Sequence, residues 1–343
     1  MSKKIRWIIA HHPKELFIRT ANQFINELEE LCPGEFELEI HTPQTFNEQY
    51  DNKMPLFNFR KPSVKNLEDD GVLGSYTNDS RPVVSLKKIQ HKWDGFFDLL
   101  EAGDFEMTQC PVSTVGSQCS SDFLGLDLPF LFRDHDHVSD VLDNEIGNEL
   151  LSGISKNRDI VGLSFTYSGG YRIIGSTEPV ESIDDLKKIK MFSYTSPGIA
   201  FFDALGIPAV KVSDLDKEDL SDVDNVASIE TTYLRFTGKN ILKTNHSMYM
   251  TTIMSSKKFM DGLTPYQQEC FNVAAKKVAK MERTWSIEDA AKFEENAVAN
   301  GVTIRELSSI DQHTLKEAAN RTHVSYKKAT SFNGSLIKRI ILK

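Results

Sequence analysis

The sequence is poor in the features that mark several common protein classes. Among 343 residues there are four cysteines, and because none of them forms a Cys-x-x-Cys pair, zinc ribbons and thioredoxin-type motifs are excluded. No apolar run approaches the ~20 residues that a membrane-spanning helix requires. The 40 Lys and Arg residues are outnumbered by 49 Asp and Glu, which gives a net charge of −9 and argues against a surface that binds nucleic acid. We therefore expect a soluble, acidic protein without a nucleic-acid partner.

The common catalytic motifs are missing as well. The sequence has no GxGxxG after a strand, no GxxxxGK[ST], no GxSxG and no HExxH. No Ser/His/Asp or Cys/His set stands out from the background. We therefore expect a binding protein rather than an enzyme, with no catalytic residue, no metal site and no cofactor.

The cysteines and the N-terminus leave the cellular compartment open. Cys110 and Cys119 are close enough in sequence to form a disulfide in an oxidising compartment; the alternative is that all four cysteines are buried or surface thiols. The basic N-terminus is followed by only four apolar residues, Trp7–Ala10, whereas a signal peptide needs ~7–15. Either the chain is periplasmic and its signal peptide has been removed, or it is cytoplasmic and Met1 is the native start.

What the sequence does contain is enough apolar material for two folded domains. Hydrophobic residues make up 40% of the chain, and at ~150 residues per domain the length predicts roughly two. Apolar spacing predicts a strand over 4–10, a helix over 16–31 and a strand over 35–41, the order typical of a parallel α/β sheet. The longest helix is expected from Thr264 to Asn300, opened by a capping box of Thr264 with Gln267. Since it is longer than one small domain, we expect it to cross both.

Four further segments lead to separate structural expectations. Asn47–Arg81 is rich in polar residues, Pro and Gly and is interpreted as an insertion or lid-like loop. Ser113–Ser121 is expected to be a loop, and the segment from His137 to Ile154 a helix. Ser168–Gly170 is expected to be a tight link between two strands.

A few polar residues are candidates for function. Asp134–His137 alternates Asp and His, but because neighbouring ligands rarely converge on one ion, we favour a helix cap by one of its aspartates over a metal site. His11 follows the first strand, where open α/β sheets bind ligands, and an ordinary loop histidine is the alternative. Arg172 follows two glycines and would suit a carboxylate, with a surface ion pair as the alternative. Glu230 ends an apolar strand, with an exposed loop residue as the alternative.

The order of several segments resembles one family closely, the solute receptors of TRAP (tripartite ATP-independent periplasmic) transporters. The resemblance runs in unbroken order from about Lys4 to Thr322. The segments that carry it are Leu128-Pro-Phe-Leu-Phe-Arg-Asp-His-Asp-His137, Val141–Gly147, Pro179–Lys187 with Ile189-Lys190, Ala200–Gly206, Asp224–Glu230 and Leu263–Glu269.

The resemblance implies an α/β fold: a two-domain, periplasmic-binding-protein-like clamp with a long helix spanning both domains. One lobe would comprise residues 1–168, including the insertion 47–81, with 250–288. The other would comprise 169–249 with 289–343. The chain would be a monomer that captures a small-molecule solute, an organic anion or polar molecule, between the lobes and delivers it to the membrane subunits of a TRAP transporter. The alternatives are a sensor or interaction module that keeps the receptor fold, and an enzyme with a metal at Asp134–His137.

The resemblance also implies a set of binding residues, with one departure. Phe192 stands where most members carry the arginine that pairs with the solute carboxylate, and it would supply an aromatic wall. Arg172 matches a second arginine position and would hold the anionic group. Thr231 follows Glu230 where members often have Asn or Trp. The further candidates for the cleft are His11, Gln109 and Ser213.

Overall fold

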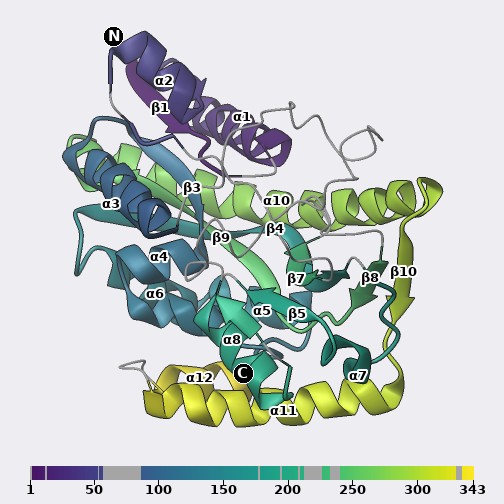
Figure 1. Cartoon of the computed structure of the whole chain (residues 1–343). Helices are drawn as coiled ribbons and strands as arrows, with labels where there is room; N and C mark the ends of the chain where they lie inside the picture. The colour runs from purple at the N-terminus through teal and green to yellow at the C-terminus, as the bar shows by residue number, and fades with distance from the viewer. Residues whose placement is uncertain are drawn as a thin grey trace.

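The computed structural model describes residues 2–11, 14–52, 54–56, 86–176, 178–193, 195–207, 209–211, 226–231, 240–329 and 334–343. Within these ranges it is a mixed α/β protein (Figure 1). The strands are β1 (Lys3–Ile8), β2 (Phe36–His41), β3 (Met107–Pro111), β4 (Ile160–Ser176), β5 (Lys190–Ser193), β6 (Ala209–Lys211), β7 (Val226–Thr231), β8 (Asn240–Lys243), β9 (Met248–Ser256) and β10 (Thr303–Glu306).

The chain begins with the predicted strand–helix–strand unit. Helix α1 (Lys14–Leu31) joins β1 to β2, and these strands pair in parallel, with Trp7 opposite Ile40. Trp7, Phe17 and Phe24 of this unit are fully buried because strand and helix turn their apolar faces toward each other. The prediction for the first 41 residues is confirmed.

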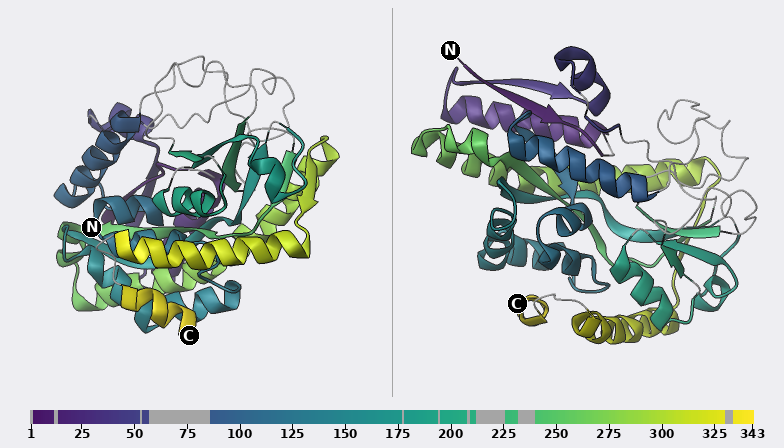
Figure 2. Two further views of the ribbon diagram at one scale, coloured as in Figure 1. Left: turned by 60° about the horizontal axis from the view of Figure 1, so that its bottom comes forward. Right: turned by 60° about the vertical axis from the view of Figure 1, so that its left-hand side comes forward.

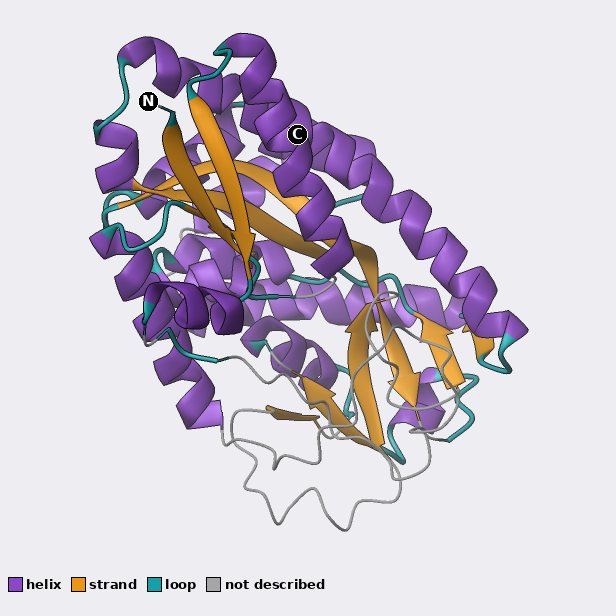
Figure 3. Cartoon of the chain, turned by 90° about the horizontal axis from the view of Figure 1, so that it is seen from above, coloured by secondary structure: helices purple, strands orange, loops and turns teal. Residues whose placement is uncertain are grey.

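The described strands form one continuous sheet in the order β2-β1-β3-β9-β4-β7-β5-β6, with β8 paired to β4 and β10 paired to β8. Strand β4 belongs to both halves of it. Up to Tyr171, which lies opposite Met248, β4 pairs with β9; from Arg172 onward it pairs with β7 and β8 instead. Figure 3 shows the consequence: the strands fall into one group near the N-terminus and another at the opposite end of the molecule.

The change of partners in β4 takes place at two glycines. Gly169 and Gly170 have φ values of 94° and 71°, a region that L-residues with a Cβ rarely adopt. The register with β9 also shifts between Tyr167 and Tyr171. The prediction of a tight link between two separate strands is therefore wrong, because the glycines let one strand bend and continue into the second group.

Helix α10 (Pro265–Ala299) is the long helix predicted from the sequence. It has 35 residues and starts with the expected capping box, in which the Thr264 hydroxyl and the Gln267 side chain each accept a backbone N–H of the other residue. In Figure 1 it runs from the side of β1 and β3 to the side of β8 and β10. It packs against α1 at one end and against β4 along its middle; Figure 2 shows α1 and α10 side by side.

The remaining helices pack into the apolar clusters of the two groups of strands. They are α2 (Pro43–Tyr50), α3 (Leu86–Ala102), α4 (Val112–Gln118), the 3-10 helix η1 (Ser121–Asp127), α5 (His135–Leu142), α6 (Glu145–Ile154), α7 (Ile183–Leu186), α8 (Ser196–Ala204), α9 (Lys257–Asp261), α11 (Ser309–Ala329) and α12 (Gly334–Leu342). Helices α8 and α11 pack together over the second group of strands.

Helix α12 instead contributes Leu336, Ile337 and Ile340 to the apolar cluster that also holds residues of α3, α5 and α6. The division into lobes given above assigns α12 to the second lobe, and that division stays a prediction.

Three local predictions differ from the structure. Ser113–Ser121 is not a loop, because Val112 and Val115 are buried and Gly116 lets α4 approach Leu124 so closely that a Cβ would lie 2.6 Å from its Cδ2. The expected helix from His137 to Ile154 is two helices, broken between α5 and α6. The expected insertion begins later than predicted, since α2 continues to Tyr50; residues 57–85 lie outside the described residues.

Candidate functional site

Arg172 lies where β4 leaves β9 and joins the second group of strands. Its side chain is buried, with 10% of its surface exposed, and its Nη2 donates to Asp127 Oδ1 at 3.1 Å. The guanidinium also lies over the ring of Tyr249, 4.2 Å from its centroid, a cation–π contact. Arg172 is therefore an arginine fixed between an acid and an aromatic ring, not the surface ion pair considered as its alternative.

The groups around Arg172 are buried polar residues from both halves of the chain. Asp127, the last residue of η1, is 4% exposed, and its Oδ2 has no hydrogen-bond partner in the described structure. Burial raises the pKa of Asp127, although the charge of Arg172 and its hydrogen bond act in the opposite direction. His246 stacks on Phe201 and its Nδ1 shares a hydrogen bond of 2.7 Å with the Thr244 hydroxyl. Burial, and then the nearby Arg172 charge, lower the pKa of His246 to about 3, so that it is neutral at physiological pH.

His11 is linked to Arg172 through Tyr249. The His11 Nε2 and the Tyr249 hydroxyl are 2.8 Å apart, and the two rings meet edge to face at 5.7 Å. Tyr249 is 7% exposed, so its ring joins the end of β1 to the start of β9. The structure thus brings two of the predicted site residues, His11 and Arg172, into contact with one tyrosine.

Three other predicted residues lie on the strands beside Arg172. Thr231 is directly opposite Arg172 in the β4–β7 pair, and Glu230 is opposite Ile173. Phe192 on β5 is paired with Ser228 of β7. The structure describes the backbone of these three residues but not their side chains. Ser213 lies wholly outside the described residues.

Gln109 lies apart from Arg172, in a buried polar network beneath the bend of β4. Its Nε2 is 2.8 Å from the Thr166 hydroxyl, 3.0 Å from that of Thr251 and 3.4 Å from Glu282 Oε1. Glu282 is fully buried on α10, and its Oε2 accepts the backbone N–H of Tyr167 at 2.8 Å. Burial raises the pKa of Glu282 to about 8, although the Tyr167 N–H and the Arg283 charge oppose that shift.

This network attaches α10 to β4 at the bend. The backbone N–H of Gly169 donates to the Ser286 hydroxyl at 3.0 Å, one helical turn beyond Glu282. Arg283 donates to the Phe165 carbonyl at 2.8 Å and to Asp143 at 2.5 Å. Side chains of the long helix therefore satisfy backbone groups of β4 where its pairing with β9 shifts, as buried polar groups require.

The Asp134–His137 segment forms a helix cap. The Asp134 carboxylate accepts the His137 backbone N–H at 2.7 Å at the start of α5, as predicted. Both ring nitrogens of His137 are engaged, Nδ1 with the Arg133 N–H and Nε2 with the Ile340 carbonyl. Across the described ranges no group of three or more His, Cys, Asp or Glu residues is placed to hold a metal ion.

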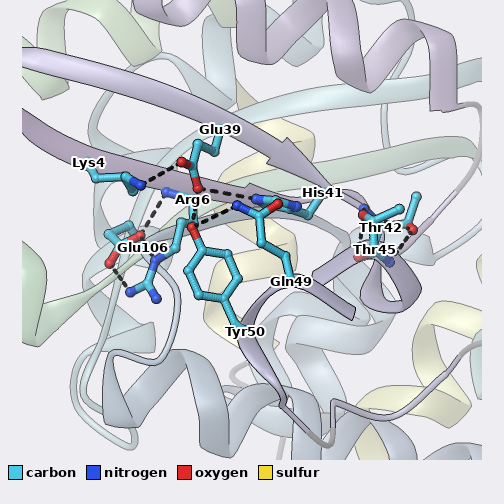
Figure 4. Close-up of polar contacts among 9 residues, drawn as sticks. All are labelled: Lys4, Arg6, Glu39, His41, Thr42, Thr45, Gln49, Tyr50 and Glu106. Carbon is cyan, nitrogen blue, oxygen red and sulfur yellow. Dashed lines mark hydrogen bonds and ion pairs between the residues drawn. The ribbon is translucent and has the colours of Figure 1, made fainter. Parts of the chain in front are cut away.

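A second polar cluster lies at the edge of the first group of strands (Figure 4). Lys4 is 2.6 Å from Glu39, and the Tyr50 hydroxyl also donates to Glu39. Arg6 binds Glu106 through Nε at 2.8 Å and Nη2 at 2.5 Å. These contacts attach α2 and β3 to the edge of the sheet, and all of their members have partners within the cluster.

A cavity of about 410 Å³ opens on another face, between α6, β4 and α10. Its polar lining includes Asn148, Glu269, Asn272 and Lys276. None of the predicted site residues lines it.

Three residues of the Arg172 environment escaped sequence reasoning. Tyr249 and His246 lie in a stretch without a motif, and only the placement of β9 and the residues before it beside β4 brings them to Arg172. Asp127 directly precedes the segment Leu128–His137 that carried the resemblance, so its position was a signal that could have identified it.

Comparison with known proteins identifies a family and several relatives of this chain. Residues 93–213 and 224–329, together more than half of the chain, match the family described as bacterial extracellular solute-binding protein, family 7 (DctP). The chain belongs to this family. Relatives include the 2,3-diketo-L-gulonate-binding periplasmic protein YiaO of Escherichia coli, 24% identical over 225 residues, which are 63% of this chain and 67% of that protein.

A further relative is the C4-dicarboxylate-binding periplasmic protein DctP of Rhodobacter capsulatus. It is 27% identical over 197 residues, covering 55% of this chain and 59% of that protein. The matched part thus spans about two thirds of YiaO and somewhat less of DctP.

Solved structures of TRAP periplasmic solute-binding proteins share the fold over nearly the whole chain. The protein of Pseudomonas putida F1 with bound D-glucuronate has a TM-score of 0.70 at 22% identity, covering 98% of this chain and 96% of that one. The protein of Shewanella oneidensis with bound succinate has a TM-score of 0.71 at 17% identity, covering 100% and 99%. The predicted two-domain clamp of the DctP family is confirmed. Among the described helices, none has the length and apolar character needed to cross a bilayer.

Proposed function

We propose that this DctP-family protein is the solute receptor of a TRAP-type transporter and binds a small organic acid beside Arg172. The observation that carries the proposal is the position of this guanidinium: it is buried at the bend of the strand that both groups of strands share. A cation held in that place is suited to a carboxylate, because charge-assisted bonds to a carboxylate are strongest where water is excluded. In this proposal the chain acts in the periplasm as a monomer and passes the solute to membrane subunits.

The chemistry of the relatives' ligands supports an anion. YiaO and DctP are named for 2,3-diketo-L-gulonate and C4-dicarboxylates, and the two structures hold glucuronate and succinate. Every one of these molecules carries a carboxylate. We infer that the solute of this chain does too, and that its carboxylate shares Arg172 with Asp127.

The other predicted residues fit this site to different degrees. His11 would face the solute together with the Tyr249 hydroxyl. Thr231 and Phe192 lie on strands that end near Arg172, which is where open α/β sheets bind ligands. Gln109 is engaged with Glu282 instead, and its role in the proposal is to hold β4 in place.

The test is binding of a panel of sugar acids and C4-dicarboxylates, measured by titration calorimetry. Arg172→Lys keeps the charge but loses the planar fork, and we expect it to weaken binding by about 10- to 100-fold, the worth of one or two charge-assisted hydrogen bonds. The double change Arg172→Met with Asp127→Asn removes both charges and leaves no unpaired acid, and it should abolish binding.

The matched control is Arg158→Met. Arg158 is a partly buried arginine, paired with Asp98 and Glu101 at 2.7 and 3.0 Å, and its loss should leave affinity unchanged. Wild-type affinity in the Arg172 variants, or the absence of any ligand among the acids, would contradict the proposal.

A further inference from the structure

We infer that Cys32 and Cys270 form a disulfide that joins the end of α1 to the first turns of α10. In the structure all four cysteines are buried thiols. The two sulfur atoms of this pair are 2.8 Å apart, although the residues are 238 positions apart in sequence. Since a disulfide bond is about 2.05 Å long, the sulfurs would have to approach by less than 1 Å.

The surroundings hold both cysteines in this position. The Tyr266 hydroxyl on α10 donates to the carbonyl of Leu31, the residue before Cys32, at 2.8 Å. Nearby, Lys3 donates to Gln267 at 3.1 Å, and Gln267 donates to Glu35. These hydrogen bonds hold the end of α1 and the residues after it against the first turns of α10, next to the sulfur pair.

The other two cysteines provide an internal comparison. Cys110 lies on β3 and contacts the Thr108 hydroxyl at 3.8 Å, and Cys119 follows α4. Both are described, and no contact between their sulfur atoms is present. The sulfur–sulfur contact is therefore made by Cys32 and Cys270, and not by the pair that is close in sequence.

Burial decides when the bond would form. Cys32 and Cys270 are 2% and 3% exposed, and burial, followed by the neighbouring Cys270 thiol, raises the pKa of Cys32 to about 12. Because thiolates, not thiols, attack disulfides, the folded pair is nearly inert. We therefore place oxidation during folding, before α1 and α10 close over the sulfurs.

The oxidant is a low-molecular-weight or protein disulfide, as oxidising compartments supply. One cysteine thiolate attacks it, forming a mixed disulfide and releasing one thiolate. The second cysteine thiolate then attacks the sulfur of the first and releases the other half of the oxidant. Two thiols and one disulfide become one disulfide and two thiols, and the two protons pass to the released thiolates.

Peptide mapping tests the bond directly. The full chain is refolded from urea with oxidised glutathione and digested with trypsin without reductant. Cys32 lies in the fragment 20–53 and Cys270 in the fragment 259–276, and we expect mass spectrometry to find these two joined and to find them separate after reduction. Cys110 and Cys119 share the fragment 93–133, so a bond between them would not join two fragments. Separate 20–53 and 259–276 fragments from the refolded protein would overturn the inference.

Thermal unfolding gives a second, independent readout. A bond between residues this far apart constrains the unfolded chain strongly, so the midpoint of the oxidised wild type should fall by several degrees when reductant is added. Cys110→Ser should show the same fall, and Cys32→Ser should show none. If reductant does not change the unfolding midpoint of the oxidised wild type, the inference is overturned. Because neither measurement involves a solute, their failure is distinct from failure of the binding proposal.

Discussion

Two glutamates of this protein, Glu282 and Glu39, show how differently one fold treats the same side chain. Glu282 on α10 is fully buried, and burial raises its pKa to about 8. Glu39 on β2 is half-buried at the edge of the sheet. Burial opposes its ionisation too, but hydrogen bonds from Lys4, Tyr50 and His41 outweigh it and lower the pKa to about 2.

The difference between the two pKa values comes from the groups that bind each carboxylate. Glu282 receives a backbone N–H and an amide, neither of them charged, and its charged neighbour Arg283 is committed to Asp143 and the Phe165 carbonyl. Glu39 receives an ammonium group directly. At Glu282 the loss of hydration on burial outweighs the hydrogen bonds that favour the carboxylate, whereas at Glu39 the bonds from Lys4, Tyr50 and His41 outweigh it.

The largest effect is expected from removing the charge next to Glu282. Arg283→Met leaves Asp143 and the Phe165 carbonyl without their donor, and breaking a buried pair of this kind costs about 3 kcal/mol or more. Urea denaturation measures the loss. Lys280→Met, one turn earlier on the exposed face of α10, is the control and should change stability by less than about 0.5 kcal/mol. If the two variants lose the same free energy of unfolding, the contacts of Arg283 do not contribute to stability as expected.

The pH dependence of Glu282 is expected to be the next largest effect. Between pH 4.5, the ordinary pKa, and pH 8 the folded chain holds a proton here that the unfolded chain has released. Stability should therefore fall as pH rises through this range, with a limiting slope of about 1.4 kcal/mol per pH unit. Glu282→Gln removes the titrating group, so the stability of the variant relative to the wild type should increase as pH rises. Parallel stability curves from pH 5 to 9 would argue against a protonated Glu282.

The smallest effect, and the one of opposite sign, is expected at Glu39. Between pH 4.5 and 2 the unfolded chain binds a proton that the folded chain does not, so this contribution is complete above pH 4.5 and is lost on acidification. Because Lys4 is half exposed, it should amount to less than about 1 kcal/mol. Comparing acid unfolding of Glu39→Gln with the wild type measures it. A variant as acid-sensitive as the wild type would place the source of acid sensitivity elsewhere.

Sequence reasoning was most successful where a pattern is local. The first strand–helix–strand unit, the cap at Asp134 and the long helix with its Thr264–Gln267 capping box all follow from spacing and capping residues within one or two turns. It failed at Ser113–Ser121 and at Ser168–Gly170. In both segments small residues resembled a loop, and only contacts with Leu124 in the first case and with α10 in the second make them regular.

Some residues of the candidate site could also be predicted from the sequence, and others could not. Arg172 could be selected because it follows two glycines and matches a family position, and His11 because it ends the first strand. Tyr249, which joins them, carries no signal in the sequence. Gln109 was selected as a cleft residue, yet the structure shows it hydrogen-bonded to Glu282 and two threonines beneath the sheet.

What the sequence alone determined is the class of the protein: an α/β receptor of acidic composition, identified by the order of its segments. Its helix and strand positions follow from short-range periodicity, which needs no knowledge of distant residues. Only the tertiary structure decided which distant side chains meet. It brings Arg172 to Asp127 and Tyr249, Glu282 to the bend of β4, and the sulfur of Cys32 into contact with that of Cys270. These pairs depend on how η1, α10 and β9 pack beside β4 and on how α1 packs on α10. The paired residues lie between 45 and 238 positions apart, and a contact over such a separation leaves no local pattern to read.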